Sequence, residues 1–277
     1  MIISKFNILF SLIVVITFAS CATATFSKYK GVGRIKRYYI YSKNLPQEFN
    51  GFKIAFASDF HYKSKLTNKR LINVVRALNS VLPDVVILGG DYPGNSVVTD
   101  MDTLFFYISK VKSKYGTYAV MGNHDIGPFY SDIKRCMNEY GINLLEDEAV
   151  SLLNGKSHII IAGVKNSFDT SNNIPISQNF GEDEYVILVS HSPDYAENKD
   201  VSNADIVLSG HTHGGQISFF KNIAPVTNSK YGTSFLKGLK YNSSGVPVLI
   251  TNGLGTSRKN IRLFTPSEIV LITLHKE

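Results

Sequence analysis

The stretch Lys53-Ile54-Ala55-Phe56-Ala57-Ser58-Asp59-Phe60-His61 sets a short apolar run directly before side chains that can bind a metal. A continuous apolar run of this length is typical of a buried strand. The pattern recurs at 84–88, which leads into Gly90-Asp91, and at 117–121, which leads into Gly122-Asn123-His124-Asp125. We therefore expect three buried strands that each end in a polar turn.

Helical patterns separate these strands. Apolar residues recur at helical spacing over 68–80, 101–113 and 129–140. The alternation of strand and helix, followed by further strands, predicts one α/β domain over residues 51–277 with two packed sheets and outer helices. The further strands are expected at 37–42, 158–163, 185–190, 205–209, 246–251 and 268–274.

The composition excludes several classes of protein. The chain has 277 residues and is 44% hydrophobic and 18% charged, so it can bury a full core and is not a disordered protein. Its two cysteines are too few for a disulfide scaffold or a cysteine-rich zinc module. The net charge of +7 lies almost wholly in residues 1–50, which hold seven basic residues and one acid. The nearly neutral body disfavours a long nucleic acid as a partner.

The N-terminal segment, residues 1–27, is expected to act as a membrane anchor or a signal. Residues 6–27 carry no charge and are long enough for a spanning helix. Three alternatives stay open: an uncleaved anchor, a secretory signal cut after Ala24, and a lipoprotein signal in which Cys21 is the lipid-bearing residue.

The basic lead-in that follows, residues 28–50, bears on orientation. Six basic residues follow the apolar segment and one, Lys5, precedes it. If the segment is an anchor, the positive-inside rule favours a body held at the cytoplasmic face of the membrane, where the basic residues could contact anionic lipid. Either signal reading would instead export the body.

Metal-capable side chains gather at the predicted strand ends. Five of the seven histidines follow an apolar run, together with two aspartates and one asparagine. In α/β sheets ligands bind at the carboxyl ends of strands, so these segments should converge on one site. Imidazole, carboxylate and amide ligands without thiolate suit Mn, Fe, Zn or Co, and seven candidates suit two bridged ions. The candidate ligands are Asp59, His61, Asp91, Asn123, His191, His211 and His213.

These motifs, taken in order, resemble those of the calcineurin-like metallophosphoesterases. The resemblance covers roughly residues 50–275 and implies a four-layer α/β/β/α sandwich. It implies two divalent metal ions, most readily Mn, that share Asp91 as a bridging ligand. One ion would be held by Asp59, His61, Asp91 and His213, and the other by Asp91, Asn123, His191 and His211. His124 would stabilise or protonate the leaving oxygen of a phosphoester substrate.

The flanking residues resemble a narrower group, the membrane-associated bacterial subfamily of YkuE-type phosphoesterases. The relevant stretches are Leu45-Pro46, Gly214-Gly215-Gln216, Asn252-Gly253-Leu254-Gly255 and Arg262. That subfamily includes an alternative UDP-2,3-diacylglucosamine pyrophosphohydrolase of lipid A synthesis. The resemblance thus implies a nucleotide-linked lipid as substrate, with a general phosphodiesterase or phosphatase acting on small soluble or cell-envelope substrates as the alternative.

Two other functions are disfavoured. Asp91 is followed by Tyr92-Pro93-Gly94 and not by the Asp-Arg-Gly of protein phosphatases in the superfamily, so a phosphoprotein phosphatase is not expected. A non-catalytic scaffold is not expected either, because every motif residue is present.

Overall fold

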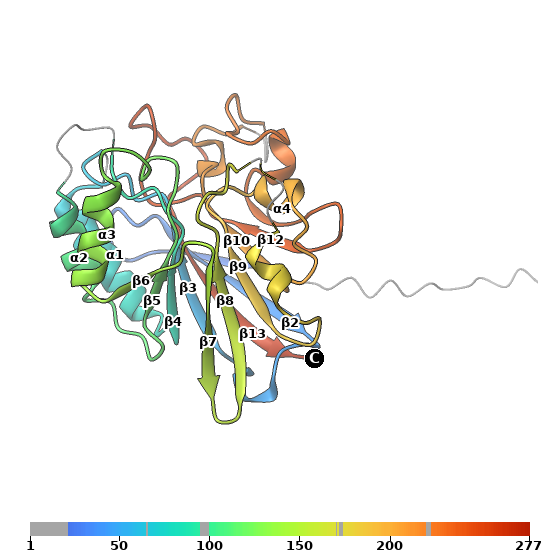
Figure 1. Cartoon of the computed structure of the whole chain (residues 1–277). Coiled ribbons are helices and arrows are strands. Elements are labelled where there is room, and N and C mark those ends of the chain that lie inside the picture. The colour runs from blue at the N-terminus through green and yellow to red at the C-terminus, as the bar shows by residue number, and fades with distance from the viewer. Residues whose placement is uncertain (1–21, 65, 95–99, 170, 172–173, 220–222) are drawn as a thin grey trace, which may run out of the picture.

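The computed structural model describes residues 22–64, 66–94, 100–169, 171, 174–219 and 223–277 (Figure 1). Its first sheet has seven strands and its second has six. The first sheet runs in the order β1 (Thr23–Phe26), β2 (Arg34–Ser42), β13 (Glu268–Lys276), β3 (Lys53–Ala57), β4 (Val85–Leu88), β5 (Thr117–Ala119) and β6 (Ile142–Leu144).

The second sheet packs face to face against the first. Its strands run in the order β11 (Gly238–Tyr241), β12 (Pro247–Ile250), β10 (Ile206–Ser209), β9 (Val186–Val189), β8 (Ser157–Gly163) and β7 (Glu148–Asn154). Strands β3 to β6 are parallel to one another, as are β8, β9, β10 and β12. The connections that follow β3, β4, β5, β9 and β10 therefore gather at one edge, at the top of Figure 1.

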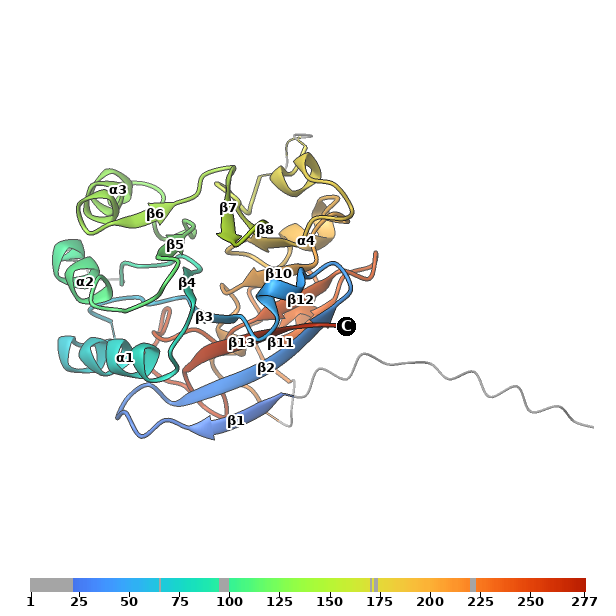
Figure 2. The same ribbon diagram turned by 90° about the horizontal axis from the view of Figure 1, so that it is seen from below.

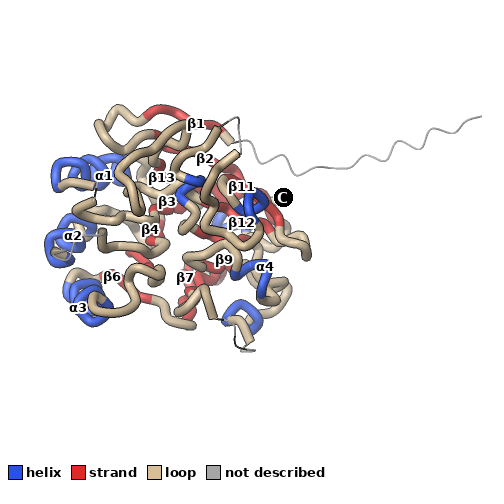
Figure 3. The backbone as a smooth tube through the Cα atoms, turned by 90° about the horizontal axis from the view of Figure 1, so that it is seen from above, coloured by secondary structure: helices blue, strands red, loops and turns tan. Residues whose placement is uncertain are grey.

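Helices cover the outer faces of both sheets (Figures 2 and 3). The first sheet is covered by α1 (Asn68–Ser80), α2 (Met101–Ile108) and α3 (Tyr130–Glu139). The second is covered by the short α4 (Tyr195–Asn198) and by loops with single 3₁₀ turns. This is the predicted four-layer α/β/β/α order, with a thin fourth layer. The 3₁₀ turns of the chain are η1 (Gln47–Phe49), η2 (Ile176–Asn179), η3 (His213–Gly215) and η4 (Gly232–Phe235).

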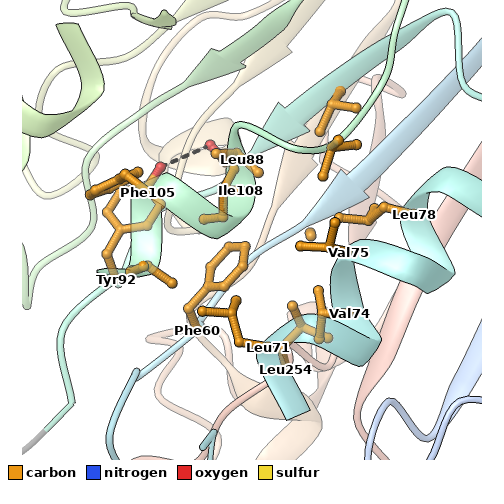
Figure 4. Packing of buried hydrophobic residues seen from close by; sticks show 14 of the residues in the cluster. Phe60, Leu71, Val74, Val75, Leu78, Leu88, Tyr92, Phe105, Ile108 and Leu254 are labelled. Atoms are coloured by element: carbon orange, nitrogen blue, oxygen red, sulfur yellow. Dashed lines mark hydrogen bonds between the residues drawn. The ribbon is translucent and has the colours of Figure 1, made fainter. Parts of the chain in front are cut away.

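The strands are apolar on both faces because each sheet is buried on both sides. In β4, Val86 and Leu88 pack under the helices, while Val85 and Ile87 face the second sheet. Figure 4 shows the first of these layers, where Leu71 of α1 lies beside Phe60, and Val75 and Leu78 of the same helix extend the layer. A third cluster lies between the second sheet and α4.

Helix and strand predictions are confirmed for most of the body, with two kinds of difference. Helix α1 begins after Thr67, whose side chain caps the helix by accepting a hydrogen bond from the Arg70 N–H. Helix α2 ends at Ile108 and not at residue 113. Strands β1, β6, β7 and β11 were not predicted, because they are short or largely exposed and lack a continuous apolar run.

The basic lead-in is part of the first sheet. Strand β2 pairs in parallel with β13 over nine residues, and β1 pairs antiparallel with the start of β2. The end of the uncharged N-terminal segment thus forms an exposed edge strand, Thr23–Phe26. Residues 1–21, which hold the apolar part of the predicted anchor or signal, lie outside the described residues. Within the described ranges, no helix combines the length and apolar character needed to cross a membrane.

Candidate metal centre

The predicted ligands meet where the two sheets present their carboxyl ends. Asp59 and His61 follow β3, Asp91 follows β4, and His124 follows β5. From the second sheet, His191 follows β9, and His211 and His213 follow β10. Aligned parallel strands thus bring together residues more than 150 positions apart, as the strand-end pattern predicts.

One group of ligand atoms is formed by Asp59, His61 and His213. These atoms all lie within 4.8 Å of one another. The two imidazole Nε2 atoms of His61 and His213 are 3.1 Å apart, and Nε2 of His213 lies 3.5 Å from Oδ1 of Asp59. Two imidazole nitrogens this close, both in neutral rings, are suited to share one cation.

A second group is formed by Asp91, His191 and His211, again within 4.8 Å. Oδ2 of Asp91 lies 3.3 Å from Nε2 of His191 and 3.4 Å from Nε2 of His61. The Asp91 carboxylate therefore stands between the two groups, in the place expected of a bridging ligand. Nε2 of His191 is buried without a well-formed hydrogen bond, which leaves it available to coordinate. The donor set fits a pair of divalent cations.

The loop after β5 supplies the remaining predicted residues. The His124 ring meets the His61 ring edge-on, with centroids 4.8 Å apart, and lies in a third group with His61 and Asp91. The His124 N–H donates to Oδ1 of Asp91 at 2.9 Å. Asn123 directly precedes His124 and is exposed. The part of Asn123 as a ligand stays a prediction, as do the separate roles of the others.

Burial prepares three of the histidines for coordination. It lowers the pKa of His61 to about 4 and that of His211 to about 3, and it lowers the pKa of His213 well below its usual range. All three rings are therefore neutral at neutral pH and carry a free nitrogen lone pair.

His191 and Asp91 behave as a pair. Burial alone would lower the pKa of His191 and raise that of Asp91. Their mutual attraction overrides burial, so the pKa of His191 rises to about 10 and that of Asp91 falls. In the metal-free centre a proton on His191 thus compensates the Asp91 carboxylate, and a cation bound there would take its place.

The ligand backbones are held in an unfavourable conformation. Asp59, His61, Asp91, His211 and His213 all have positive φ, between 41° and 67°. For residues other than glycine this region costs about 1–2 kcal/mol each. Five predicted ligands are among the twelve such residues in the described chain. Backbone strain of this kind concentrates at functional sites, where the surrounding structure enforces it.

Two glycines allow the loops to approach this closely. A side chain at Gly122 would collide with Oδ1 of Asp91, and one at Gly210 would collide with Ser58 and Asp59. Each of these two glycines is thus required by the packing of an earlier motif against it.

Asp125 holds two of the motifs together. Its carboxylate is fully buried and accepts hydrogen bonds from the N–H groups of Asp91, Tyr92 and Gly122 at 2.6–2.8 Å. Both oxygens are used in this way, so Asp125 positions the Asp91 loop. The sequence marks Asp125 only as a neighbour of His124.

Arg262 is a second supporting residue, marked in the sequence only by resemblance. Its guanidinium donates to the carbonyl oxygens of Asn252 and Gly255 at 2.6–2.9 Å, and to that of His213 at 3.2 Å. It also lies 3.2 Å from Nδ1 of His213. Burial lowers the pKa of Arg262 to about 10, so the group stays charged at neutral pH. The Arg262 guanidinium thus links the 252–255 loop to the predicted ligand His213.

Two cavities adjoin the centre. One, of about 610 Å³, lies beside Phe168, whose ring stands 5.0 Å from that of His211. The other, of about 320 Å³, has His213 in its wall. Phe168 comes from a loop whose sequence gives no sign of its place, because only the fold brings it to His211.

Comparison with known proteins identifies the class of this fold and site. The family model described as calcineurin-like phosphoesterase matches residues 52–215. The chain belongs to that family. It is therefore a metal-dependent phosphoester hydrolase with a dimetal-binding fold, as the motifs predict.

The relatives agree with this assignment. The chain is 28% identical to an uncharacterized metallophosphoesterase of Aquifex aeolicus, over 87% of this chain and 91% of the relative. It is also 28% identical to the uncharacterized metallophosphoesterase YkuE of Bacillus subtilis, over 85% and 83%. The NAD nucleotidase of Haemophilus influenzae shares the fold, with a TM-score of 0.50 at 14% identity over 73% of this chain and 50% of that one.

Replacing the bridging carboxylate should empty the centre. We expect Asp91→Asn to reduce bound metal from about two ions per chain to well below one, because both ligand groups lose a shared anion. Metal analysis of the purified protein measures this. Asp132→Asn, an exposed carboxylate on α3, is the control and should keep full metal content. Unchanged metal in Asp91→Asn would show that Asp91 does not bridge.

The affinity of the centre for metal should depend on pH. Burial and the nearby Asp91 raise the pKa of Asp59 to about 6 in the metal-free protein. A protonated carboxyl cannot coordinate, so affinity should fall as the pH drops below about 6 and recover above it. Dialysis against metal-free buffer at about pH 5 and about pH 7.5, followed by metal analysis, tests this, with circular dichroism to check the fold. Equal retention at both values would contradict the expectation.

Proposed function

We propose that this hydrolase cleaves a phosphodiester or pyrophosphate bond in an anionic amphiphile at a membrane surface. The observation that carries the proposal is the pair of ligand groups joined by Asp91, beside a cavity with cationic and apolar walls. The specific candidate is UDP-2,3-diacylglucosamine, which would give a lipid 1-phosphate and UMP.

The residues of the centre would divide the work as follows. Two divalent cations, for which Mn is the proposed species and Fe, Zn or Co the alternatives, supply Lewis-acid activation of a water and of the phosphoryl oxygens when bound. Asp91 and the neutral histidines hold this charge in place. His124, fixed through its backbone bond to Asp91, faces the open side and delivers a proton to the leaving oxygen. Asp125 and Arg262 hold the Asp91 loop and the 252–255 loop in position.

The smaller cavity supports an amphiphilic substrate. Its lining includes the apolar residues Ile217, Pro225 and Val226 and the basic residues Arg258 and Lys259. The cationic side chains suit the phosphates of a nucleotide-linked lipid. The apolar wall suits its hydrocarbon part.

Exposed apolar side chains surround this cavity and support contact with a lipid surface. Two segments come together here: the Ser218 N–H donates to the Leu263 carbonyl, and the Phe219 and Phe264 rings lie 6.2 Å apart. Phe264 is 70% exposed and Ile223 62% exposed. We call this surface the apolar rim; its members are Phe219, Ile223, Val226, Ile261, Leu263 and Phe264. Clustered exposed apolar residues beside basic ones are typical of interfacial membrane binding.

The N-terminal segment would add the second membrane contact. Apolar burial by a few loops gives weak, reversible binding, and stable anchoring takes two signals. Residues 1–21 are the proposed second signal, as an anchor that leaves the body at the cytoplasmic face, or as a lipoprotein or export signal that places it outside.

A second candidate is a phosphodiesterase or phosphatase for small soluble substrates. The larger cavity favours it, because its walls include Lys199, Lys230, Asp169 and Asp194 around Phe168. A polar substrate part could be held there, with Phe168 as a stacking surface.

Removal of the proposed acid should separate turnover from metal binding. We expect His124→Ala to lose about 10²–10⁴-fold in kcat, the usual contribution of a general acid, while it retains its metal. Because His124 lies in a group with His61 and Asp91, metal analysis must accompany the kinetics. His158→Ala, at a partly exposed histidine paired with Glu184, is the control. Full activity in His124→Ala would overturn the assignment.

A substrate panel tests the amphiphile. We expect Mn-loaded protein to hydrolyse UDP-2,3-diacylglucosamine faster than an aryl phosphodiester or a phosphomonoester. Phe264→Asp and Ile223→Asp should slow the lipid reaction about tenfold and leave the aryl reaction unchanged, because a charge there opposes contact with lipid. Leu153→Asp, at an exposed site on β7, is the matched control. Activity confined to soluble monoesters would favour the second candidate instead.

A further inference from the structure

Four basic side chains gather where β2 of the first sheet lies beside β11, the edge strand of the second sheet. Arg34 and Lys36 belong to β2, Lys237 directly precedes β11, and Lys240 lies within it. Strands β2 and β11 lie beside one another in Figures 2 and 3. We call the space between them the basic crevice. Lys237 interacts electrostatically with the other three cations of the crevice. Lys36 interacts in the same way with Arg34 and Lys240.

The negative charge in the basic crevice is too small to balance these cations. Glu268, at the start of β13, is the acid that acts on Lys36, Lys237 and Tyr38. Its carboxylate already accepts hydrogen bonds from the Asn252 N–H and from the Asn252 side chain at 3.0–3.2 Å. Arg34 Nε stands 3.6 Å from it, beyond a good hydrogen bond. Within the described ranges, Lys36 and Lys240 have no ion pair.

Unused donors point into the same space. The Tyr38 hydroxyl is buried without a hydrogen-bond partner, on a residue that is only 2% exposed, and Arg34 Nε is likewise unpartnered. A methyl group on Gly238 would lie 3.5 Å from both Nζ of Lys36 and Oη of Tyr38, so glycine leaves room between the two donors. Lys237 donates to Oγ of Ser218 at 3.3 Å.

Such a group of donors is unfavourable without an anion. Burial lowers the pKa of Lys36 and of Lys237, and the neighbouring cations lower both further. Buried hydroxyl and guanidinium donors are normally paired, and a buried donor without a partner is unfavourable. An anion that accepts several hydrogen bonds would meet all of these needs together.

A cavity of about 370 Å³ lies farther along the same two strands and is lined by Tyr39, Leu239 and Tyr241 among others. Asp205 and Glu277 lie in its wall, so this cavity does not itself suit an anion. It has space for an uncharged group attached to one.

We propose that the basic crevice binds a phosphate group, either free or carried by a lipid headgroup, at a site separate from the catalytic centre. A tetrahedral oxyanion has enough acceptor oxygens for Tyr38, Lys36, Arg34 and Lys237 at once, and its double charge suits their number. A carboxylate has two oxygens and one charge, and would leave some of these donors unmet.

The test is a calorimetric titration of the metal-loaded protein with inorganic phosphate. Phosphate also binds the metal centre, so the comparison is between proteins that share that centre. We expect wild type to show two classes of site and Lys36→Gln/Lys237→Gln to lose one, with affinity there at least about tenfold weaker. Lys112→Gln/Lys156→Gln, at two exposed lysines, is the matched control and should titrate as wild type does. Identical titrations of all three proteins would overturn the proposal.

Three further measurements test whether the loss of phosphate binding comes from the proposed site. Tyr38→Phe removes one hydroxyl and should weaken the same site by a smaller factor, whereas an unchanged affinity would count against the proposed geometry. Without phosphate, Lys36→Gln/Lys237→Gln should have a Tm no lower than wild type, because it removes like charges. Hydrolysis of a soluble aryl phosphodiester should be unchanged, so this proposal can fail while the proposed function stands.

The source of the phosphate is distinguished with a soluble lipid. Dihexanoyl phosphatidic acid carries the same anion on an apolar body. Tighter binding than inorganic phosphate, lost in Lys36→Gln/Lys237→Gln, would identify a lipid headgroup as the ligand. Equal binding of the two, lost in the same variant, would identify free phosphate. For either ligand, a second class of site that persists unchanged in the variant would overturn the proposal.

Discussion

The position of the Asp91 carboxylate between His61 and His191 is the constraint on which the centre depends. The first sheet supplies Asp91 and His61, and the second supplies His191, so this contact joins the two halves of the sandwich. A buried carboxylate is costly unless it is paired, and here the compensation is a proton on His191 or a cation. The contact that joins the two sheets is thus the same contact that places the candidate ligands.

The loops around Asp91 show how this arrangement is maintained. Several ligands sit at positive φ, and glycines stand wherever a side chain would collide with a neighbouring motif. Asp125 and Arg262 both hold loops by their backbones: the Asp125 carboxyl group accepts from N–H groups, and the Arg262 guanidinium donates to carbonyl oxygens. Strained turns persist because such buried networks define their geometry.

The surroundings of the centre are uneven in polarity. One cavity has both acidic and basic side chains in its wall and borders Phe168, and the other combines apolar side chains, which include Val226 of the apolar rim, with basic ones. The basic charge that the sequence concentrates near the N-terminus is also redistributed by folding. Arg34 and Lys36 do not form a free arm, because β2 brings them against Lys237 and Lys240, about 200 positions later.

The sequence by itself determined the fold class, most of the strands and helices, and the residues that gather at the centre. It could do so because buried parallel strands need continuous apolar runs, and their carboxyl ends share one edge. Only the tertiary structure decided the edge strands β1, β6, β7 and β11, which are paired by neighbours and not by their own apolar pattern. It also decided the roles of Asp125, Arg262 and Phe168, and the meeting of β2 with β11, because these depend on contacts between segments far apart in the chain.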